Sequence, residues 1–222
     1  MIFGVLRFPG SCDEVDAQLA CERVGDARII WHGDEEIGEV DAVVIPGGFS
    51  YGDYLRVGAI ARFAPAMERV REFAEAGGPV LGICNGFQVL CEAGMLPGAL
   101  LPNEGLRFLC RQVDVEVVGT DSPWTSACEV GERLSIPVKH TTGRYFAPPE
   151  LLERIEAEGQ IVLRYADGQN PNGSLGDIAG VRNEQGSVVG LMPHPEHAVD
   201  PLTGSVDGLR LFESAARELV GA

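Results

Sequence analysis

Short apolar runs alternate with amphipathic stretches through the first half of the chain. The runs that predict strands lie at residues 2–8, 27–31, 41–45 and 80–83. The stretches that predict helices lie at residues 12–24, 57–76 and 85–94. Nearly continuous apolar runs are typical of parallel strands that helices cover on both faces. This alternating order with short connections predicts an α/β fold of flavodoxin-like type, a doubly wound and mostly parallel sheet with flanking helices.

The pattern changes after Pro102, where longer alternating stretches predict antiparallel or mixed strands. Strands are predicted at 106–118, 133–140, 161–165, 178–182 and 187–192, and helices at 150–158 and 206–220. The turn residues at 183–186 predict a hairpin between the last two strands. No internal repeat, low-complexity tract or linker divides the chain, so we expect a single domain over residues 1–222.

Composition narrows the range of partners and compartments. The formal net charge of −16 disfavours nucleic acid and anionic membranes as partners. No apolar stretch is long enough to span a bilayer and no secretion signal is visible, and six cysteines without paired spacing favour a reducing cytoplasm over a disulfide framework or a zinc site. The single lysine, Lys139, stands against sixteen arginines, which we interpret as compositional bias and not as a site.

Residues 80–86 carry the first candidate for chemistry, because an apolar run ends there in Gly-x-Cys-x-Gly and passes directly into a helical pattern. A nucleophile elbow has this form, a sharp strand–turn–helix connection that presents its central side chain. Gly82 and Gly86 are expected because a Cβ at either position would collide with the neighbouring strand and helix. The N-terminus of a helix also favours the thiolate form of cysteine. Cys84 is therefore the candidate nucleophile, and the alternative is a buried core cysteine at an ordinary turn.

A second candidate is the segment Met-Pro-His-Pro-Glu-His at 192–197, which also follows an apolar strand. His194 and Glu196 are two residues apart, a spacing that places both side chains on the same side of an extended segment. The carboxylate can then accept from one ring nitrogen while the other takes a proton from a thiol. By itself the motif is also compatible with a solvated loop, but a cysteine elbow with a distant histidine is what a cysteine nucleophile requires.

A third candidate is Gly47-Gly48, which follows a predicted strand. An acyl-transfer site needs backbone N–H groups where the oxyanion forms. Asn85, directly after the candidate nucleophile, can supply one of them and Gly48 the other. A phosphate-binding loop is disfavoured because neither a GxGxxG pattern nor a Gly-Lys-Ser/Thr sequence is present, and a plain tight turn remains an alternative.

Together these motifs resemble the class I, or triad-type, glutamine amidotransferases. The forms Pro-Gly-Gly-Phe-Ser-Tyr-Gly-Asp, Gly-Ile-Cys-Asn-Gly-Phe-Gln, Asn-Pro-Asn-Gly-Ser and Gly-Leu-Met-Pro-His-Pro-Glu are, within that family, similar to the glutaminase subunits of phosphoribosylformylglycinamidine synthase. They lie at 46–53, 82–88, 170–174 and 190–196. The resemblance covers nearly the whole chain.

The resemblance implies a role for each matching residue. Cys84 would be the nucleophile, His194 the base and Glu196 the carboxylate that orients it, with Gly48 and Asn85 as the oxyanion hole. The side chains implied to contact the substrate glutamine are Phe49, Gln88 and His140.

The resemblance also implies a reaction and partners. Glutamine would be hydrolysed through a glutamyl thioester, and the ammonia would pass to an ATP-dependent synthetase that converts formylglycinamide ribonucleotide to formylglycinamidine ribonucleotide in de novo purine biosynthesis. The implied partners are L-glutamine, a large PurL-type synthetase subunit and a small PurS-type subunit. The chain shows no nucleotide-binding loop, so we expect no cofactor or metal in it, with ATP and Mg²⁺ used by the synthetase subunit.

The sequence departs from the family pattern at two places. His197 stands where an arginine usually follows Pro-Glu, and we expect this change to affect a surface pair or a partner contact. Residues 140–143 read His-Thr-Thr-Gly in place of His-Gly-(Glu/Asp)-Gly, which bears on the glutamine contacts near His140.

Three alternatives stay open on the sequence. The chain could be the amidotransferase subunit of another synthetase. It could be a deglycase-like cysteine hydrolase or chaperone, although that class places histidine directly after the cysteine and Asn85 stands here. It could also be a flavodoxin-like binding module in which Cys84 is merely buried. Reaction of Cys84 with a glutamine-like electrophile would separate a glutaminase from the deglycase-like class and from the binding module.

Overall fold

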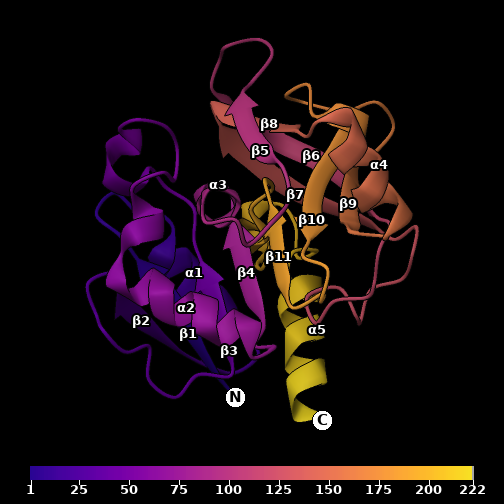
Figure 1. Ribbon diagram of the computed structural model, residues 1–222. Helices are drawn as coiled ribbons and strands as arrows, with labels where there is room; N and C mark the ends of the chain where they lie inside the picture. Colours follow the sequence, from indigo (N-terminus) through magenta and orange to yellow (C-terminus); the bar gives the residue numbers. More distant parts are fainter. Residues whose placement is uncertain (222) are drawn as a thin grey trace.

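The computed structural model describes residues 1–221, which form a mixed nine-stranded sheet flanked by helices (Figure 1). The strands of this sheet are β1 (Ile2–Arg7), β2 (Asp26–Trp31), β3 (Ala42–Ile45), β4 (Val80–Ile83), β6 (Leu109–Val117), β7 (Arg133–His140), β9 (Ile161–Tyr165), β10 (Ile178–Arg182) and β11 (Val188–Leu191). The helices are α1 (Glu14–Cys21), α2 (Pro65–Glu75), α3 (Asn85–Glu92), α4 (Pro149–Ala157) and α5 (Leu209–Val220).

The sheet has a parallel part and an antiparallel part. Its strand order is β2-β1-β3-β4-β11-β10-β9-β6-β7, and the first five of these strands run parallel to one another. The strands from β10 to β7 are joined antiparallel. The expected fold class and the extra antiparallel strands of the C-terminal half are therefore confirmed.

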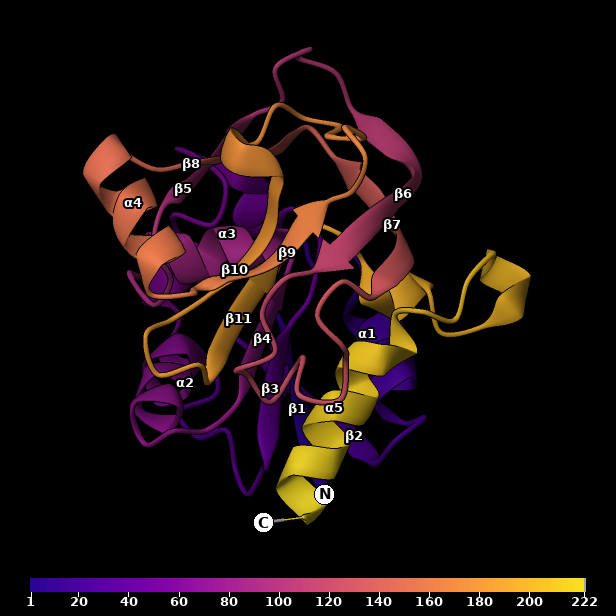
Figure 2. The ribbon, with the colours of Figure 1, turned by 90° about the vertical axis from the view of Figure 1, so that its right-hand side faces the viewer.

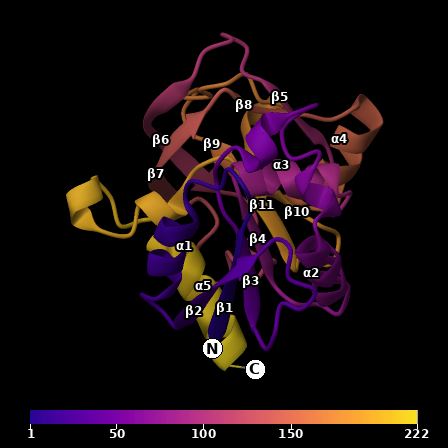
Figure 3. The same cartoon turned by 90° about the vertical axis from the view of Figure 1, so that its left-hand side faces the viewer.

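Helices cover both faces of the parallel part. Views from opposite sides place α1 and α5 on one face and α2, α3 and α4 on the other (Figures 2 and 3). The central strands β3 and β4 are apolar and every one of their residues is buried, whereas the edge strand β2 is largely exposed. Burial on both faces is the physical reason for the continuous apolar runs in the sequence.

The structure differs from the predicted helices and strands at residues 57–64 and at residues 99–102 and 142–146. The helix expected at 57–76 begins only at Pro65, and a short 3₁₀ turn, η2 (Ala61–Phe63), precedes it. Gly58 has a positive φ of 75°, and Ala64 is extended (ψ 141°), as residues before proline tend to be. The second difference is a small antiparallel sheet of β5 (Ala99–Pro102) and β8 (Thr142–Phe146), which was not predicted.

The chain order brings three connections to one edge of the sheet. β3, β4 and β11 are parallel neighbours, so their carboxyl ends lie side by side. The segments that follow them are the Gly47-Gly48 loop, the Cys84 turn and the 194–197 segment. Ligands in open α/β sheets bind beyond such strand ends.

Among residues 1–221, no helix combines the length and apolar character needed to cross a bilayer.

Candidate active site

Cys84 lies in a strained turn between β4 and α3. Its backbone has φ 50° and ψ −99°, outside the regions that non-glycine residues ordinarily adopt. An added Cβ on Gly86 would lie 1.9 Å from the carbonyl oxygen of Ile45, and one on Gly82 would lie 2.7 Å from the backbone of Gly86. The steric reason for the two glycines is thus confirmed. Strain at a turn that is held from both sides is a common mark of a functional position.

Asn85 ties the turn to the neighbouring loop. Its side chain accepts a hydrogen bond from the backbone N–H of Ser50 at 3.1 Å and donates one to Gln88 Oε1 at 2.8 Å. As the first residue of α3, it has a backbone N–H with no acceptor inside the helix. This N–H therefore remains available to an oxyanion.

The Gly47-Gly48 peptide is held by the segment that precedes α1. The carbonyl of Gly47 accepts hydrogen bonds from the backbone N–H groups of Cys12 at 3.2 Å and Asp13 at 3.3 Å. In a trans peptide the N–H of Gly48 points the opposite way, away from those donors. Gly48 has a φ of 145°, and a Cβ there would lie 2.7 Å from backbone atoms of Gly10 and Cys12. Only glycine fits this position.

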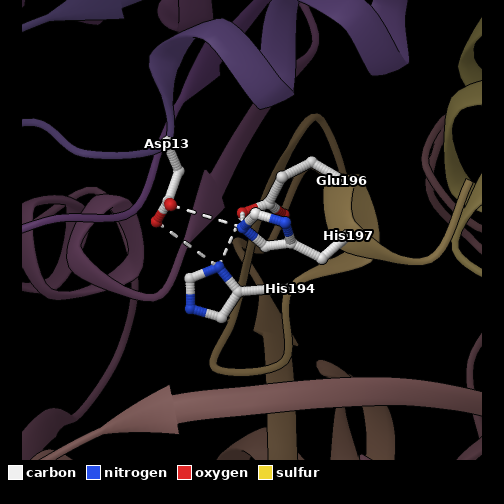
Figure 4. A group of neighbouring side chains, drawn as sticks. All are labelled: Asp13, His194, Glu196 and His197. Carbon is white, nitrogen blue, oxygen red and sulfur yellow. Dashed lines mark hydrogen bonds and ion pairs between the residues drawn. The ribbon is translucent and has the colours of Figure 1, made fainter. Parts of the chain in front are cut away.

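His194 and Glu196 are bonded to each other, although the segment is not extended as predicted. Pro195–His197 forms a 3₁₀ turn, η4, and within it Nδ1 of His194 lies 2.6 Å from Oε1 of Glu196 (Figure 4). Both side chains are almost fully buried. The backbone N–H of His194 donates to the carbonyl of Pro137 at 2.8 Å, which anchors the segment to β7. Nε2 of His194 has no hydrogen-bond partner among the described residues, so it is free to exchange a proton.

The surroundings of His194 favour its charged form. Burial alone would lower the pKa of the imidazole, but the carboxylate of Glu196 and the negative charge that Cys84 can carry raise it well above the ordinary value. An imidazole that accepts a thiol proton and holds it as imidazolium next to a carboxylate is suited to general acid–base work.

Asp13 extends this pair into a larger network that sequence reasoning missed. Its carboxylate lies 3.7 Å from Nδ1 of His194, 3.3 Å from Nε2 of His197 and 2.5 Å from Nζ of Lys139 (Figure 4 shows the two histidines). His197 also lies 3.6 Å from Glu196. Burial would raise the pKa of Asp13, but the hydrogen bond with His197 and the positive charges of His194 and Lys139 lower it, so the carboxylate is ionised.

The surroundings of two residues differ from what the sequence indicates. Lys139, the single lysine, lines the pocket, and its ammonium group is paired with Asp13. His197, expected at a surface pair or a partner contact, pairs with the buried carboxylates of Asp13 and Glu196, and its own side chain is 25% exposed. Neither could be recognised locally, because Asp13 is far from both in the sequence.

The same cluster has the residue types of a cation site. Asp13, His194, Glu196 and His197 each offer one ligand-type atom, and these atoms lie within 4.8 Å of one another. They are, however, engaged with each other through hydrogen bonds. We interpret the cluster as an ion-pair network around a protonated histidine, not as a metal centre.

A pocket above these groups brings the predicted residues together. Gly48, Phe49, Cys84, Gln88, His140 and His194 all contribute to its wall. Glu196 lies behind His194 and Asn85 beneath the turn, and neither lines the pocket. The other residues of the wall, to which the sequence analysis assigned no role, are Cys12, Asp13, Asp53, Val57, Phe108, Lys139, Thr141 and Thr142. The sulfur of Cys84 lies 3.9 Å from the carbonyl oxygen of Lys139 at the end of β7.

The three residues expected to contact the substrate differ in whether their side chains are free to bind a ligand. Phe49 is 46% exposed at the mouth of the pocket. The amide of Gln88 is engaged internally, since it donates to the carbonyl of Thr142 at 2.5 Å and accepts from Asn85. Gln88 therefore shapes the wall of the pocket through these two contacts.

His140 is held neutral in a buried polar network. Its Nε2 lies 2.9 Å from the side-chain amide nitrogen of Asn172, an atom that can only donate, so Nε2 accepts and Nδ1 carries the proton. Burial and the charge of His194 lower the pKa of His140 to about 3. Nδ1 has no partner among the described residues, which leaves a buried donor on a residue that lines the pocket. Asn172 also bonds Gly143, so the Asn-Pro-Asn-Gly-Ser motif supports the pocket wall.

Comparison with known proteins agrees with this geometry. Residues 3–217 match the CobB/CobQ-like glutamine amidotransferase domain family. The chain is 59% identical over 215 residues to the phosphoribosylformylglycinamidine synthase subunit PurQ of Rubrobacter xylanophilus, covering 96% of this chain and 97% of that protein.

Solved structures point the same way. A chain in the structure of PurLQS from Thermotoga maritima is 42% identical, covers 98% of both chains and superposes with a TM-score of 0.89. A glutamine amidotransferase from the same organism shares the fold with a TM-score of 0.64 at 16% identity, over the full length of this chain and 99% of its own.

Proposed function

The chain belongs to the glutamine amidotransferase family, among the PurQ glutaminase subunits of phosphoribosylformylglycinamidine synthase in purine biosynthesis, and from this premise we propose that Cys84, His194 and Glu196 are its catalytic triad. The observation that carries the assignment is the meeting of two distant segments at neighbouring strand ends. The strained Cys84 turn and the bonded pair of His194 and Glu196 follow the parallel neighbours β4 and β11.

The first half of the reaction forms a thioester. With the thiol proton already held at Nε2 of His194, the Cys84 thiolate attacks the side-chain carbonyl carbon of glutamine. A tetrahedral intermediate forms, the C–N bond breaks, and His194 returns the proton to the departing nitrogen, which leaves as ammonia. Glu196 accepts from Nδ1 throughout and stabilises the imidazolium form.

The second half releases glutamate. A water molecule gives a proton to Nε2 of His194 and adds to the thioester carbonyl. The C–S bond then breaks, and the thiolate leaves and recovers the proton. In both halves the oxyanion is stabilised by the backbone N–H groups of Gly48 and Asn85, each of which is worth about 10²–10³ in rate in comparable sites.

The pocket supplies further groups for the substrate. The buried N–H at Nδ1 of His140 is a donor for a carbonyl or carboxylate oxygen of glutamine, and Phe49 at the mouth covers its aliphatic part. Gln88 supports these contacts through the carbonyl of Thr142.

The partners follow from the relatives. PurLQS of Thermotoga maritima assembles PurL, PurQ and PurS, and we propose that this chain likewise delivers ammonia to a PurL-type synthetase together with a PurS-type subunit. ATP and Mg²⁺ would be used in the synthetase subunit, with no cofactor or metal in this chain, and the complex would work in the cytoplasm.

The test is Cys84→Ser in the reconstituted complex. Glutamine-dependent synthesis should fall by at least about 10³-fold, since removal of a triad nucleophile costs several orders of magnitude, while ammonia-dependent synthesis continues. Cys110→Ser, at an exposed cysteine, is the matched control and should keep full activity. A Cys84→Ser chain that hydrolyses glutamine at the wild-type rate would remove Cys84 from the mechanism.

A further inference from the structure

His194 faces two carboxylates, and only one of them belongs to the triad. Glu196 is hydrogen-bonded to Nδ1, and the second carboxylate, that of Asp13, lies 3.7 Å from the same nitrogen. Asp13 lies in the loop between β1 and α1, whereas His194 follows β11, and β3 and β4 lie between β1 and β11 in the sheet. The nucleophilic mechanism above makes no use of it.

We propose that Asp13, with Lys139 as its counter-ion, is a second positioning carboxylate of His194, which sets how strongly the imidazole holds its proton. Its effect on the rate of glutamine hydrolysis rests on the proposed function, in which His194 is the catalytic base. Asp13 does not contact the reacting atoms and acts only through His194.

The first support is the placement of Asp13 within the site. It is 3% exposed, and its backbone N–H donates to the carbonyl of Gly47, the residue before Gly48. A Cβ on Gly47 would lie 2.3 Å from Oδ2 of Asp13 and 2.6 Å from Cε1 of His194. Glycine at 47 therefore leaves the space in which carboxylate and imidazole approach each other.

The second support is the balance of charge. Two ionised carboxylates beside one imidazole would hold its proton too tightly for release to the leaving ammonia. Lys139 offsets one of them, because its ammonium lies 2.5 Å from Oδ1 of Asp13. His197 bridges both carboxylates, at 3.3 Å from Asp13 and 3.6 Å from Glu196. The arrangement leaves one net negative charge facing His194 when His197 is neutral.

The other ionisable groups around His194 are His140 at the end of β7, Glu196 and His197 of η4, and Cys84 at the elbow, which is replaced by serine in every chain of the titration. Cys21 of α1 faces Glu196. His140 and Cys21 are uncharged at neutral pH, since burial lowers the pKa of the first and raises that of the second. Asp13 and Lys139 are thus a pair of opposite charges that can be removed one at a time.

The test measures the pKa of His194 by NMR titration of its imidazole nitrogens in the full chain carrying Cys84→Ser, which removes the thiolate. Asp13→Asn should lower this pKa by about one unit or more, since an opposite charge lies 3.7 Å from Nδ1 in the wild type. Lys139→Met removes the counter-ion of Asp13 and should raise the pKa. The double variant should fall between the two. Asp13→Glu, which keeps the charge, should stay closer to the starting value than Asp13→Asn.

Matched controls remove charges of the same kind nearby. Asp16→Asn alters a half-buried aspartate in the first turn of α1, and Arg111→Met alters an exposed cation on β6, next to β7. Neither should move the His194 titration. Shifts of the same sign in Asp13→Asn and Lys139→Met, or none in either, would overturn the proposal. If Asp13→Asn does not fold, Lys139→Met decides the test alone through the sign of its shift.

Activity supplies an independent readout. With Cys84 restored, the alkaline limb of glutamine-dependent kcat in the complex should move to lower pH in Asp13→Asn and to higher pH in Lys139→Met, with a smaller change in KM. The NMR result does not depend on glutamine hydrolysis. If the two variants shift the pKa of His194 in the expected directions but the chain never hydrolyses glutamine, the proposed function is refuted. If the chain is active but the pKa of His194 does not shift, this inference is refuted.

Discussion

The Cys84 turn and the 194–197 segment do their work by different physical means. The turn is held by backbone sterics: Cys84 is strained at φ 50°, and added Cβ atoms on its flanking glycines would strike backbone within 2.7 Å. The histidine segment is held by charge. Its two histidines meet the carboxylate of Asp13, which is itself paired with Lys139 from a distant part of the chain.

The turn fixes the position of the Cys84 sulfur, whereas the charges around His194 set the protonation of its imidazole. A sharp turn with no room for side chains fixes where the sulfur lies, and little else can adjust it. An imidazole among carboxylates and an ammonium responds to every charge change near it, because electrostatic effects act over several ångströms in a buried site. Substitutions in the first region should therefore cost folding, and those in the second should change rate and pH dependence while the fold persists.

Gly86→Ala should have the largest effect and test the steric half of this comparison. Its Cβ would lie 1.9 Å from the carbonyl oxygen of Ile45, a contact with backbone that no side-chain rotation relieves. We expect a loss of at least about 3 kcal/mol in the free energy of unfolding, or no folded protein, measured by urea denaturation. Gly105→Ala, where a Cβ meets nothing within 4 Å, is the control. Equal stability of the two variants would mean that the elbow can relax.

Glu196→Gln should have the next largest effect and leave the fold intact. The amide can still bond Nδ1 of His194 but cannot stabilise the imidazolium, a change that costs up to about 10⁴ in kcat in related triads. The alkaline limb of the pH–rate profile should also move to lower pH, since the charged imidazole loses support. Steady-state glutamine hydrolysis in the complex measures both, with Glu35→Gln on the exposed surface as the control. Near-wild-type activity in Glu196→Gln would transfer the orienting role to Asp13.

His140→Gln should have the smallest effect and separate the two histidines of the pocket. Because the pKa of folded His140 is lowered to about 3, the unfolded chain binds a proton there first as pH falls below about 6.5. His140 therefore destabilises the folded state between those values, by at most about 1.4 kcal/mol per pH unit.

Urea denaturation of the wild type and of His140→Gln at pH 7.5, 6.5 and 5.5 measures this contribution. The variant should lose less stability on acidification. The difference between the two proteins should be constant at and above pH 7.5, where His140 is neutral in both states. A difference that does not change between pH 6.5 and 5.5 would show that His140 is protonated in the folded protein.

The sequence alone determined the parallel core and the positions of the chemical groups within it. Continuous apolar runs mark buried parallel strands, and the glycines around Cys84 and Gly48 are local signatures of backbone that no side chain can approach. The alternating order of β3 and β4 also placed the Gly48 and Cys84 segments at one edge of the sheet, whereas the position of β11 beside β4, which brings His194 to the same edge, is seen only in the structure.

Only the tertiary structure decided the charge network and the pocket wall. Lys139 is an ordinary alternating position of β7, and its meaning depends on Asp13, which lies 126 residues away. The short strands β5 and β8 exist because they pair with each other, and no local pattern distinguishes them from loop. The steric limits of a turn depend on residues that are adjacent in the sequence, so they can be predicted from it. An ion pair depends on which distant side chains the fold brings within a few ångströms, and a single sequence does not show that.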